Sequence, residues 1–477
     1  MTKRGLLLLL FIYLLAHLLV RLLLSQTLQV DDAEQIRLSQ ELLLGYPIPQ
    51  PPMYSWLSWG MFQILGTSLF ALTLLKYTLI AATFWLTWLV SGQLFQNLQT
   101  RYFATVSYLL MPSFAWHMHQ GFTHTILLGF GIIVSLHALL SLKNNPNTKN
   151  YLYLGLTLGI GLMGKYSFLL FILPLLIAAL SVERYRTIIL DAKILLTLGV
   201  FALVIAPHAY WLTQHHQEIF ASIDQKLQVN GSSVLFERLH SVGRFVGAAI
   251  AFVLPFLLIF LIGSWRRLFN LDKQLFKNDN LLLLSRFYWV IILSIAILAI
   301  FVSMPHFKVR WFHPLMMIFP LWMLMRIERQ QLLSKTVARW FYSVLMLLSV
   351  LVLSVRITQV TIGPELGKYG RLNRPMIETL EKLPAHLTAQ NILRTADGFI
   401  GSHLLTQYPD NTIVIKNKEF QNSYQAQEKH CLWLWDDDTP YVNPNIESTL
   451  QSGQLVTHVA EFKYTLFYAL SPAQECR

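Results

Sequence analysis

The chain has 477 residues, of which 54% are hydrophobic and only 13% are charged, and its mean hydropathy is +0.48. This apolar content is too high for a soluble globular domain, so a membrane protein is expected. The formal net charge is +12, but Lys and Arg lie between apolar segments rather than along one basic stripe, so the charge indicates membrane topology and no nucleic-acid partner.

The apolar segments predict a polytopic α-helical membrane protein. A bilayer core takes roughly 20 apolar residues per helix, and about 11 segments serve as transmembrane helices by that measure. The first follows Lys3 and Arg4 and has no cleavage site after it, so it is expected to be retained. The short, Trp-rich stretch 54–65 is expected at the membrane interface. The predicted spans are residues 5–24, 70–95, 102–118, 124–142, 151–163, 166–181, 194–212, 244–263, 284–303, 310–326 and 339–357.

The loops between these spans alternate in charge, which predicts their orientation. With Lys3 and Arg4 inside, every second loop collects Lys and Arg, as short cytoplasmic loops do. The polar motifs described below all fall in the other loops, and so does the tail after the last span. The sequence therefore predicts a multi-pass protein of the inner (plasma) membrane whose active site faces the periplasmic or extracytoplasmic side.

The first outer loop, residues 25–69, begins with an acidic pair. Asp31 and Asp32 precede Glu34 and a run of apolar residues that predicts an amphipathic helix along the membrane surface, namely Ile36, Leu38, Leu42, Leu43 and Leu44. Asp31 and Glu34 would suit a capping box at the start of that helix. Alternatively, desolvation beside the bilayer tunes one of the aspartates as a general base.

A proline-rich stretch follows in the same loop and contains Tyr46 and Gln50. A rigid aromatic anchor and a wall of a substrate site explain this stretch equally well.

Three histidines, His117, His119 and His124, lie within eight positions of the second outer hairpin. Ligands at i and i+2 do not share a helix face, and no acidic residue is near, so polar lining of a cavity is favoured over a metal site. No cofactor is predicted, and a divalent metal is kept only as the less favoured alternative.

Two cationic motifs face the outer side. Lys165, followed by Tyr166, interrupts a long apolar stretch, where an ionisable residue is costly unless it has a partner. Lys308 and Arg310 lie between His306 and His313 at an outer membrane boundary. Snorkelling of the long side chains explains both motifs; the functional alternative is a bound phosphate, for which Arg supplies a forked donor and Lys a point charge.

The tail predicts a small extracytoplasmic α/β domain. Its short apolar runs, such as 412–415 and 431–435, are separated by Gly, Pro and Asn. The predicted domains are therefore residues 1–357 and 358–477. The two cysteines, Cys431 and Cys476, both lie in the tail, and a disulfide and two free thiols are both compatible with that position.

Taken together, the motifs resemble a known family. They are the acidic pair after the first span, a loop that ends in Pro51, Pro52, Tyr54 and Trp56, the break at Gly161–Tyr166, and the late run of Lys308, Arg310, Trp311 and Pro314. This set resembles the membrane glycosyltransferases of the GT-C class, specifically glycosyltransferase family 39, with the protein O-mannosyltransferases and the lipid A aminoarabinose transferases. The resemblance spans roughly residues 31–320.

The resemblance implies an inverting hexosyl- or pentosyltransferase. Its donor would be a polyprenyl-phosphate-linked sugar, and its acceptor a lipid, glycan or protein at the outer face of the membrane. Asp31 would be the catalytic carboxylate and Asp32 its neighbour, while Lys165, Lys308 and Arg310 would hold the carrier's phosphate. The residues expected to line the substrate site are Glu34, Tyr46, Gln50, His124, Tyr166, His215, His306 and His313. The stretch Pro207, Trp211 and His215 also matches a family pattern.

The chain departs from the family pattern at two places. Gln50 stands where many relatives carry an acidic residue or His before the proline pair, and His124 stands where many carry a carboxylate. The sequence therefore predicts neither the sugar nor the acceptor.

Two other functions use similar chemistry. A transporter or flippase of lipid-linked sugar would also need a cationic phosphate site, but it predicts inverted repeats and charges on both sides of a central pathway, which the sequence lacks. A surface-polysaccharide polymerase or ligase would use outward Arg and His without a carboxylate after the first span. Both are less consistent with the motifs than a glycosyltransferase.

Overall fold

The computed structural model describes residues 2–227, 235–261, 277–301, 312–389, 391–416, 418–420, 430–437 and 449–476. The chain divides into two compact units. Unit 1 comprises Met1–Tyr13, Leu43–Tyr54 and Thr78–Leu351, and unit 2 comprises Leu14–Leu42, Ser55–Tyr77 and Val352–Arg477. The predicted division into residues 1–357 and 358–477 stays a prediction.

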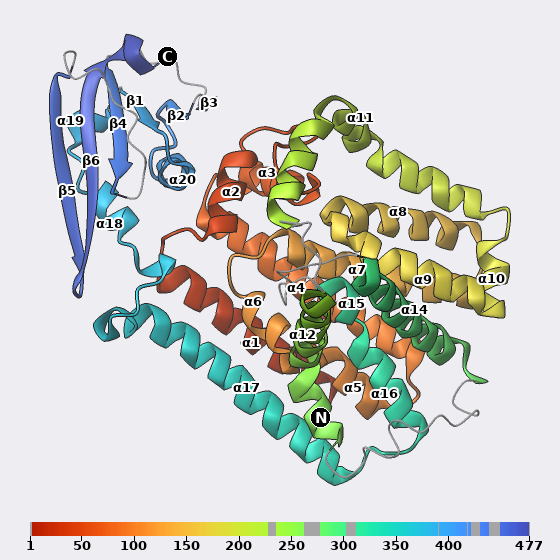
Figure 1. Ribbon diagram of the computed structural model, residues 1–477. Helices are drawn as coiled ribbons and strands as arrows, with labels where there is room; N and C mark the ends of the chain where they lie inside the picture. Colours follow the sequence, from red (N-terminus) through yellow and green to blue (C-terminus); the bar gives the residue numbers. More distant parts are fainter. Residues whose placement is uncertain are drawn as a thin grey trace. The chain divides into compact units, whose positions relative to one another are not determined.

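Four helices run from one unit into the other: α1 (Lys3–Leu23), α3 (Met53–Leu65), α4 (Leu69–Leu94) and α17 (Lys335–Thr361). The remaining helices of unit 1 (Figure 1) are α5 (Leu98–Val106), α6 (Pro112–His117), α7 (His124–Asn144), α8 (Thr148–Gly164), α9 (Leu169–Ser181), α10 (Glu183–Ile189), α11 (Ile194–Leu227), α12 (Leu235–Leu261), α14 (Asp279–Phe301), α15 (His313–Met316) and α16 (Phe319–Arg329). Short 3-10 turns, η1 (Ser107–Leu110) and η2 (Tyr166–Phe168), precede α6 and α9.

Within the described residues, five helices are long and apolar enough to cross a membrane: α1, α4, α7, α17 and the Ile194–Gln217 part of α11. A sixth span results if Tyr166–Ser181 and Glu183–Ile189, which meet at a bend of 110°, count as one. The chain is thus a polytopic membrane protein. The predicted span 102–118 is divided among α5, η1 and α6, and the full count of about 11 spans stays a prediction.

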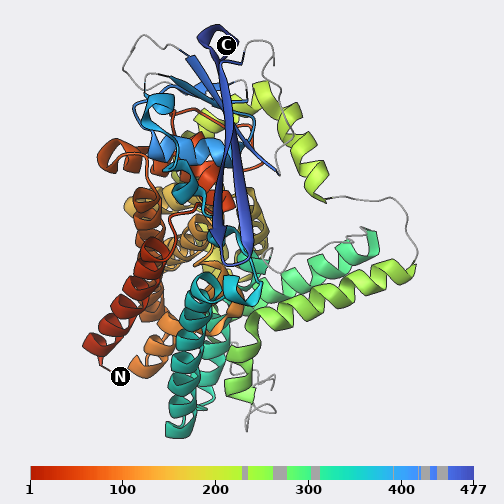
Figure 2. The same cartoon turned by 90° about the vertical axis from the view of Figure 1, so that its left-hand side faces the viewer.

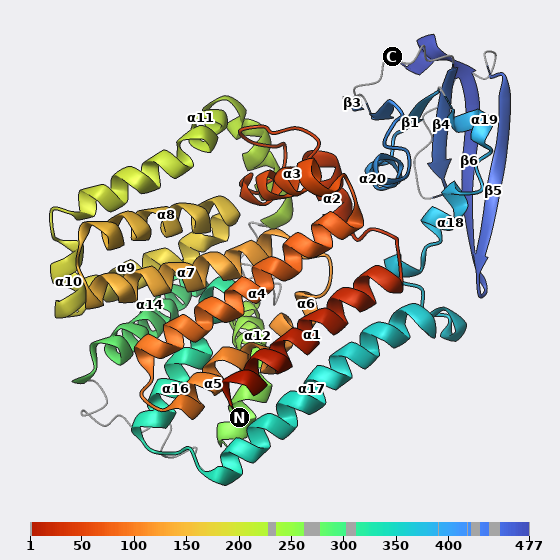
Figure 3. The same ribbon diagram turned by 180° about the vertical axis from the view of Figure 1, so that it is seen from behind.

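Small residues allow three helices of unit 1 to pack closely. Figures 1 and 3 both show α8 between α7 and α11. A Cβ atom on Gly131 of α7 would lie 2.7 Å from the Cα of Gly161 of α8, and one on Gly159 would lie 2.7 Å from the Cβ of Val204 of α11. Such close approach of backbones is how membrane helices gain van der Waals contact in the absence of a hydrophobic driving force.

Unit 2 contains a six-stranded mixed sheet in the order β3-β2-β1-β4-β6-β5. Its strands are β1 (Ile392–Thr395), β2 (Ile413–Ile415), β3 (Lys418–Phe420), β4 (His430–Asp436), β5 (Gln451–Val459) and β6 (Phe462–Pro472). Strand β1 is parallel to β2 and β4, whereas the other pairs are antiparallel. The crossover from β1 to β2 contains helix α20 (Gly398–Gln407), as parallel neighbours require. The β5–β6 hairpin is the longest pair of strands (Figure 2). The prediction that the C-terminal part of the chain contains a sheet domain is confirmed.

One face of this sheet shares its hydrophobic core with the segment after the first span. Leu28, Ala33 and Ile36 belong to the same buried cluster as Ile400 and Leu404 of α20. Short helices α18 (Met376–Leu380) and α19 (Ala385–Thr388) add Met376, Leu380 and Leu387 to it.

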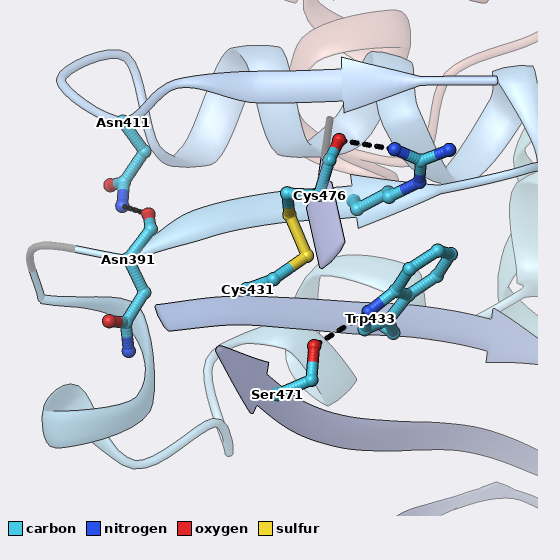
Figure 4. The surroundings of a disulfide bond; sticks show 7 residues. Asn391, Asn411, Cys431, Trp433, Ser471 and Cys476 are labelled. Atoms are coloured by element: carbon cyan, nitrogen blue, oxygen red, sulfur yellow. Dashed lines mark hydrogen bonds between the residues drawn. A yellow bond between two sulfur atoms is a disulfide. The ribbon is translucent and has the colours of Figure 1, made fainter. Parts of the chain in front are cut away.

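Cys431 and Cys476 form a disulfide (Figure 4). It joins β4 to the C-terminal 3-10 turn η8 (Ala473–Cys476), with the Cα atoms 5.5 Å apart, and both residues are buried. Beside it the Trp433 indole N–H donates to the Ser471 hydroxyl at 3.1 Å, and the Arg394 guanidinium lies 4.6 Å from the centre of the Trp433 ring. The disulfide alternative is thus confirmed.

The surface helix predicted after the first span is shorter than expected. Helix α2 covers Val30–Leu38 and ends at Ser39, so the predicted extension to Leu44 is wrong. Ile36 packs into the core of unit 2, whereas Leu42 is 54% exposed. The residues beyond Ser39 therefore gain no burial from continuing the helix, and Pro47 excludes it further on.

Candidate active site

The two predicted catalytic carboxylates lie in the first turn of α2 and have different surroundings. Asp32 is buried, and its Oδ2 atom lies 3.0 Å from Nη2 of Arg21 in an ion pair whose side chains are 3% and 7% exposed. Asp31 is half-buried. The more open carboxylate is therefore Asp31, the residue that the family resemblance implies as the catalytic one.

The capping box expected for Asp31 and Glu34 is wrong. The N-cap of α2 is Gln29, whose backbone N–H donates to Asp32 Oδ2 at 3.2 Å. Asp32 therefore serves as the acidic residue at the third helical position, which stabilises the start of the helix. Glu34 is half-buried on the next turn, and Asp31 occupies the second helical position.

The electrostatic surroundings of Asp32 stabilise its charged form. Burial raises the pKa of the Asp32 carboxyl, but the charges of Arg21 and Lys76 and the hydrogen bonds from Arg21 and Gln29 outweigh burial and hold its pKa below the ordinary value. A carboxylate with a lowered pKa is a weak base. Asp32 is therefore better suited to holding Arg21 than to accepting a proton.

Among the described residues of unit 2, three cations are buried, and the sequence motifs predicted none of them. They are Arg21 on α1, Lys76 on α4 and Arg356 on α17. Arg21 also donates to the Ser25 and Thr27 carbonyls at 2.8 and 3.0 Å, and the Arg356 Nη1 lies 2.8 Å from His17 Nδ1. The signal that could have found them is an ionisable residue inside an apolar span, where it is costly without a functional or structural reason.

In unit 1, the predicted phosphate ligand Lys165 lies at the C-terminal end of α8. Its Nζ donates to Thr125 Oγ1 at 2.7 Å. His124, the preceding residue on α7, donates from Nδ1 to the Gly164 carbonyl at 3.2 Å, and the Tyr54 ring centroid is 5.6 Å from that of His124. The structure thus brings together two predicted site residues, Lys165 and His124.

Tyr166 begins a column of four aromatic rings in unit 1. The Tyr166 hydroxyl donates to His208 Nε2 at 2.6 Å, because the other ring nitrogen of His208 donates to the Leu44 carbonyl at 3.1 Å. Trp211 stacks on His208 with centroids 5.7 Å apart and on His215 with centroids 4.3 Å apart. The column therefore joins the predicted site residues Tyr166 and His215 through His208 and Trp211.

The ring column also holds the proline-rich loop that carries Tyr46 and Gln50. A Cβ atom on Gly45 would overlap the Trp211 ring, so only glycine fits there. Tyr46 is buried and its hydroxyl accepts the Leu43 N–H at 3.4 Å, whereas Gln50 is half-buried. The loop is thus anchored against α11.

Another predicted site residue in the described part of unit 1 is His313. His313 is buried in α15, edge-on to Phe252 with ring centroids 5.1 Å apart. His119 bonds to the Tyr13 hydroxyl at 2.6 Å, and His117 donates to the Ser113 carbonyl at 3.2 Å, so each outer-hairpin histidine has its own partner. No group of three metal-binding side chains is found in the part of the chain that the structure describes. His306, Lys308 and Arg310 lie outside the described residues, and their role in phosphate binding stays a prediction.

Comparisons with known proteins agree with one another. Residues 49–211 match the sequence model of the dolichyl-phosphate-mannose-protein mannosyltransferase family. The chain is 29% identical to the lipopolysaccharide core galacturonosyltransferase RgtB of Rhizobium johnstonii over 87% of this chain and 84% of that protein. It is 28% identical to RgtA, another lipopolysaccharide core galacturonosyltransferase of that organism, over 86% and 81%.

A solved structure has the same fold. ArnT from Cupriavidus metallidurans bound to undecaprenyl phosphate aligns over 98% of both chains with a TM-score of 0.63 and 12% identity. The apo form of that protein aligns over 99% of both chains with a TM-score of 0.58 and 13% identity.

Proposed function

We propose that this chain, a GT-C glycosyltransferase of the protein mannosyltransferase and ArnT type, transfers a uronic acid from a polyprenyl-phosphate-linked donor to lipopolysaccharide. The resemblance read from the sequence motifs is confirmed at the level of this class. The observation that carries the proposal is the alignment of most of the chain with two lipopolysaccharide galacturonosyltransferases. The donor type is supported by the undecaprenyl phosphate bound to the structural relative.

The membrane orientation is part of the proposal. The Lys and Arg alternation favours an inner-membrane protein of about 11 spans. Its acidic pair and C-terminal sheet would lie on the periplasmic side, where a lipopolysaccharide acceptor is reached. The Cys431–Cys476 disulfide supports that side, because disulfides persist in oxidising compartments.

The proposed reaction is a direct displacement at the anomeric carbon. An acceptor hydroxyl oxygen bonds to that carbon as the bond to the phosphate oxygen breaks, and the hydroxyl proton passes to the Asp31 carboxylate. The products are the glycosylated acceptor with inverted anomeric configuration and polyprenyl phosphate. Phosphate is a good leaving group when its charge is stabilised, which is the role proposed for Lys165, Lys308 and Arg310.

An acidic sugar adds a second negative charge to the donor. A uronic acid carries a carboxylate besides the carrier's phosphate. The cations Arg21, Lys76 and Arg356 are buried in unit 2, where Asp31 and Asp32 both act on the charge of Lys76. A bidentate Arg recognises a carboxylate well. The preference for an acidic over a neutral sugar therefore rests on the alignment with the galacturonosyltransferases.

The test uses purified full-length protein in detergent with lipopolysaccharide as acceptor. Three donors are compared: undecaprenyl-phosphate-linked galacturonic acid, galactose and aminoarabinose. Transfer of galacturonic acid at least 10-fold faster than of the others supports the proposal. Faster transfer of the neutral or the amino sugar would leave the enzyme class intact and disprove the uronic acid. A lipid-linked sugar that crosses vesicle membranes without transfer would favour the flippase instead.

A further inference from the structure

The residues that lead into α2 are held by the buried histidine of α20. The backbone N–H of Leu28 donates to Nε2 of His403 at 3.0 Å, and Nδ1 of His403 donates to the Phe399 carbonyl at 2.8 Å. His403 is 0% exposed. Both ring nitrogens are therefore used, and one tautomer of the neutral ring satisfies both bonds.

Neutral histidine is also the form that this environment favours. Burial lowers the pKa of His403 to about 4, although the hydrogen bond to the Phe399 carbonyl opposes this shift. A protonated ring would direct an Nε2–H at the Leu28 N–H and break the bond. The contact is therefore intact at neutral pH.

Further contacts connect the same two segments. The Ser402 hydroxyl lies 2.7 Å from the Ala33 carbonyl within α2 and shares its proton with the Gly398 carbonyl at 2.6 Å. The Thr27 hydroxyl donates to the Arg374 carbonyl at 2.7 Å. Segment 27–33 is thus bonded before and within the first turn of α2 to residues more than 300 positions later in the chain.

These hydrogen bonds lie next to the carboxylate proposed as the catalytic base. Leu28 is one residue before the N-cap Gln29, whose N–H bonds Asp32, and three residues before Asp31. A shift of the chain at Leu28 would move the start of α2 and hence both carboxylates. Displacements of about 1 Å in a catalytic group cost on the order of 100-fold in rate.

We propose that His403 is a positioning residue: by accepting the Leu28 N–H, it fixes the first turn of α2 and so the reach of the Asp31 carboxylate. This inference rests on the proposed role of Asp31 as the base. It assigns to the C-terminal sheet domain a part in catalysis, because α20 belongs to the crossover between β1 and β2. No contact of His403 with substrate is required.

Two substitutions of His403 distinguish its hydrogen bond to Leu28 from its hydrogen bond to Phe399. His403→Gln places an amide oxygen near the position of Nε2, where it accepts the Leu28 N–H. His403→Asn is shorter, so it retains a polar group near Phe399 and loses the bond to Leu28. The control is Asn411→Ala, which removes two hydrogen bonds of the same domain, to Thr388 and Asn391, at 2.7 and 2.9 Å and away from α2.

Full-length variants are assayed for kcat and donor KM, and hydrogen–deuterium exchange is followed on a peptide that covers residues 25–38. We expect His403→Asn to lower kcat at least 10-fold with KM within twofold, and to speed exchange in this peptide. His403→Gln should retain kcat within about threefold. Asn411→Ala should lower the melting temperature but leave kcat and the peptide's exchange unchanged.

Equal kcat for His403→Asn and the wild type would overturn the inference. So would an equal loss in Asn411→Ala, since stability alone would then explain both. The exchange experiment needs no substrate, so it tests the anchoring independently of the proposed function. If the wild type shows no transfer, the proposed function fails. If exchange in His403→Asn is unchanged, the anchoring by His403 is refuted. Should His403→Asn not fold, accelerated exchange in Ser402→Ala would support the anchoring and unchanged exchange would refute it.

Discussion

At the scale of single residues, the two adjacent aspartates have separate tasks. Asp32 is enclosed by Arg21 and the Gln29 N–H, whereas Asp31 is half-buried on the same turn. Adjacent positions in a helix point about 100° apart. One acid can therefore be held in an ion pair while its neighbour faces a different environment.

This difference predicts opposite effects of two conservative substitutions. Asp31→Asn keeps the size of the side chain and removes its basicity, so we expect transfer to fall at least 100-fold with the melting temperature unchanged. Asp32→Asn leaves Arg21 buried without its carboxylate and should destabilise the protein by about 3–5 kcal/mol. The measurements are single-turnover transfer and thermal unfolding in detergent.

Arg21→Ala is the matched control for the second effect, because it breaks the same ion pair from the other side. It should lower the melting temperature about as much as Asp32→Asn. Near-normal transfer by Asp31→Asn would remove Asp31 as the base. An acceptor that attacks through an already ionised phosphate needs no base, so the assay uses an acceptor with a free hydroxyl.

At the scale of elements, the C-terminal end of the chain is held to the sheet by a covalent bond. The disulfide closes a loop with a sequence separation of 45 residues between β4 and η8, and cross-links of this kind stabilise mainly by restricting the unfolded chain. Cys431 and Cys476 pack with Ile392, Val414 and Trp433 in a small cluster apart from the main core of unit 2.

Cys431→Ser is therefore expected to destabilise the C-terminal sheet by about 2–5 kcal/mol. Limited proteolysis and thermal unfolding, with and without reductant, measure the effect. Reductant should lower the melting temperature of the wild type and leave that of Cys431→Ser unchanged. A free-thiol label that enters the folded wild type without reductant would contradict the disulfide.

At the scale of the whole molecule, charge alternation predicts which segments share a compartment. Reporter fusions after Leu142 and after Lys368 should report opposite sides, with the fusion after Leu142 inside and that after Lys368 outside, because an odd number of predicted spans separates them. A fusion after Leu44 should agree with the one after Lys368. If the fusions after Leu142 and Lys368 report the same side, the number of spans is wrong.

Several features followed from the sequence alone because they depend on local composition. Apolar runs located the helices α1, α4, α7 and α17, and short runs broken by Gly, Pro and Asn located the C-terminal sheet domain. The motifs also predicted the glycosyltransferase class with which the comparisons agree, since each is a short local pattern. Local patterns predicted the ends of helices less reliably. The length of α2 and its N-cap depend on the burial of Ile36 and on the Asp32 ion pair.

Only the tertiary structure revealed which distant residues meet. The bond from Leu28 to His403 joins positions 375 apart, and that from His17 to Arg356 joins positions 339 apart. Neither hydropathy nor spacing specifies such pairs, because they depend on how helices and strands pack after they form. For the same reason, the position of Lys76 inside the predicted span 70–95 does not indicate its interaction with Asp32. The acidic pair was visible in the sequence, but the division of labour between Asp31 and Asp32 depends on Arg21 and the fold around it.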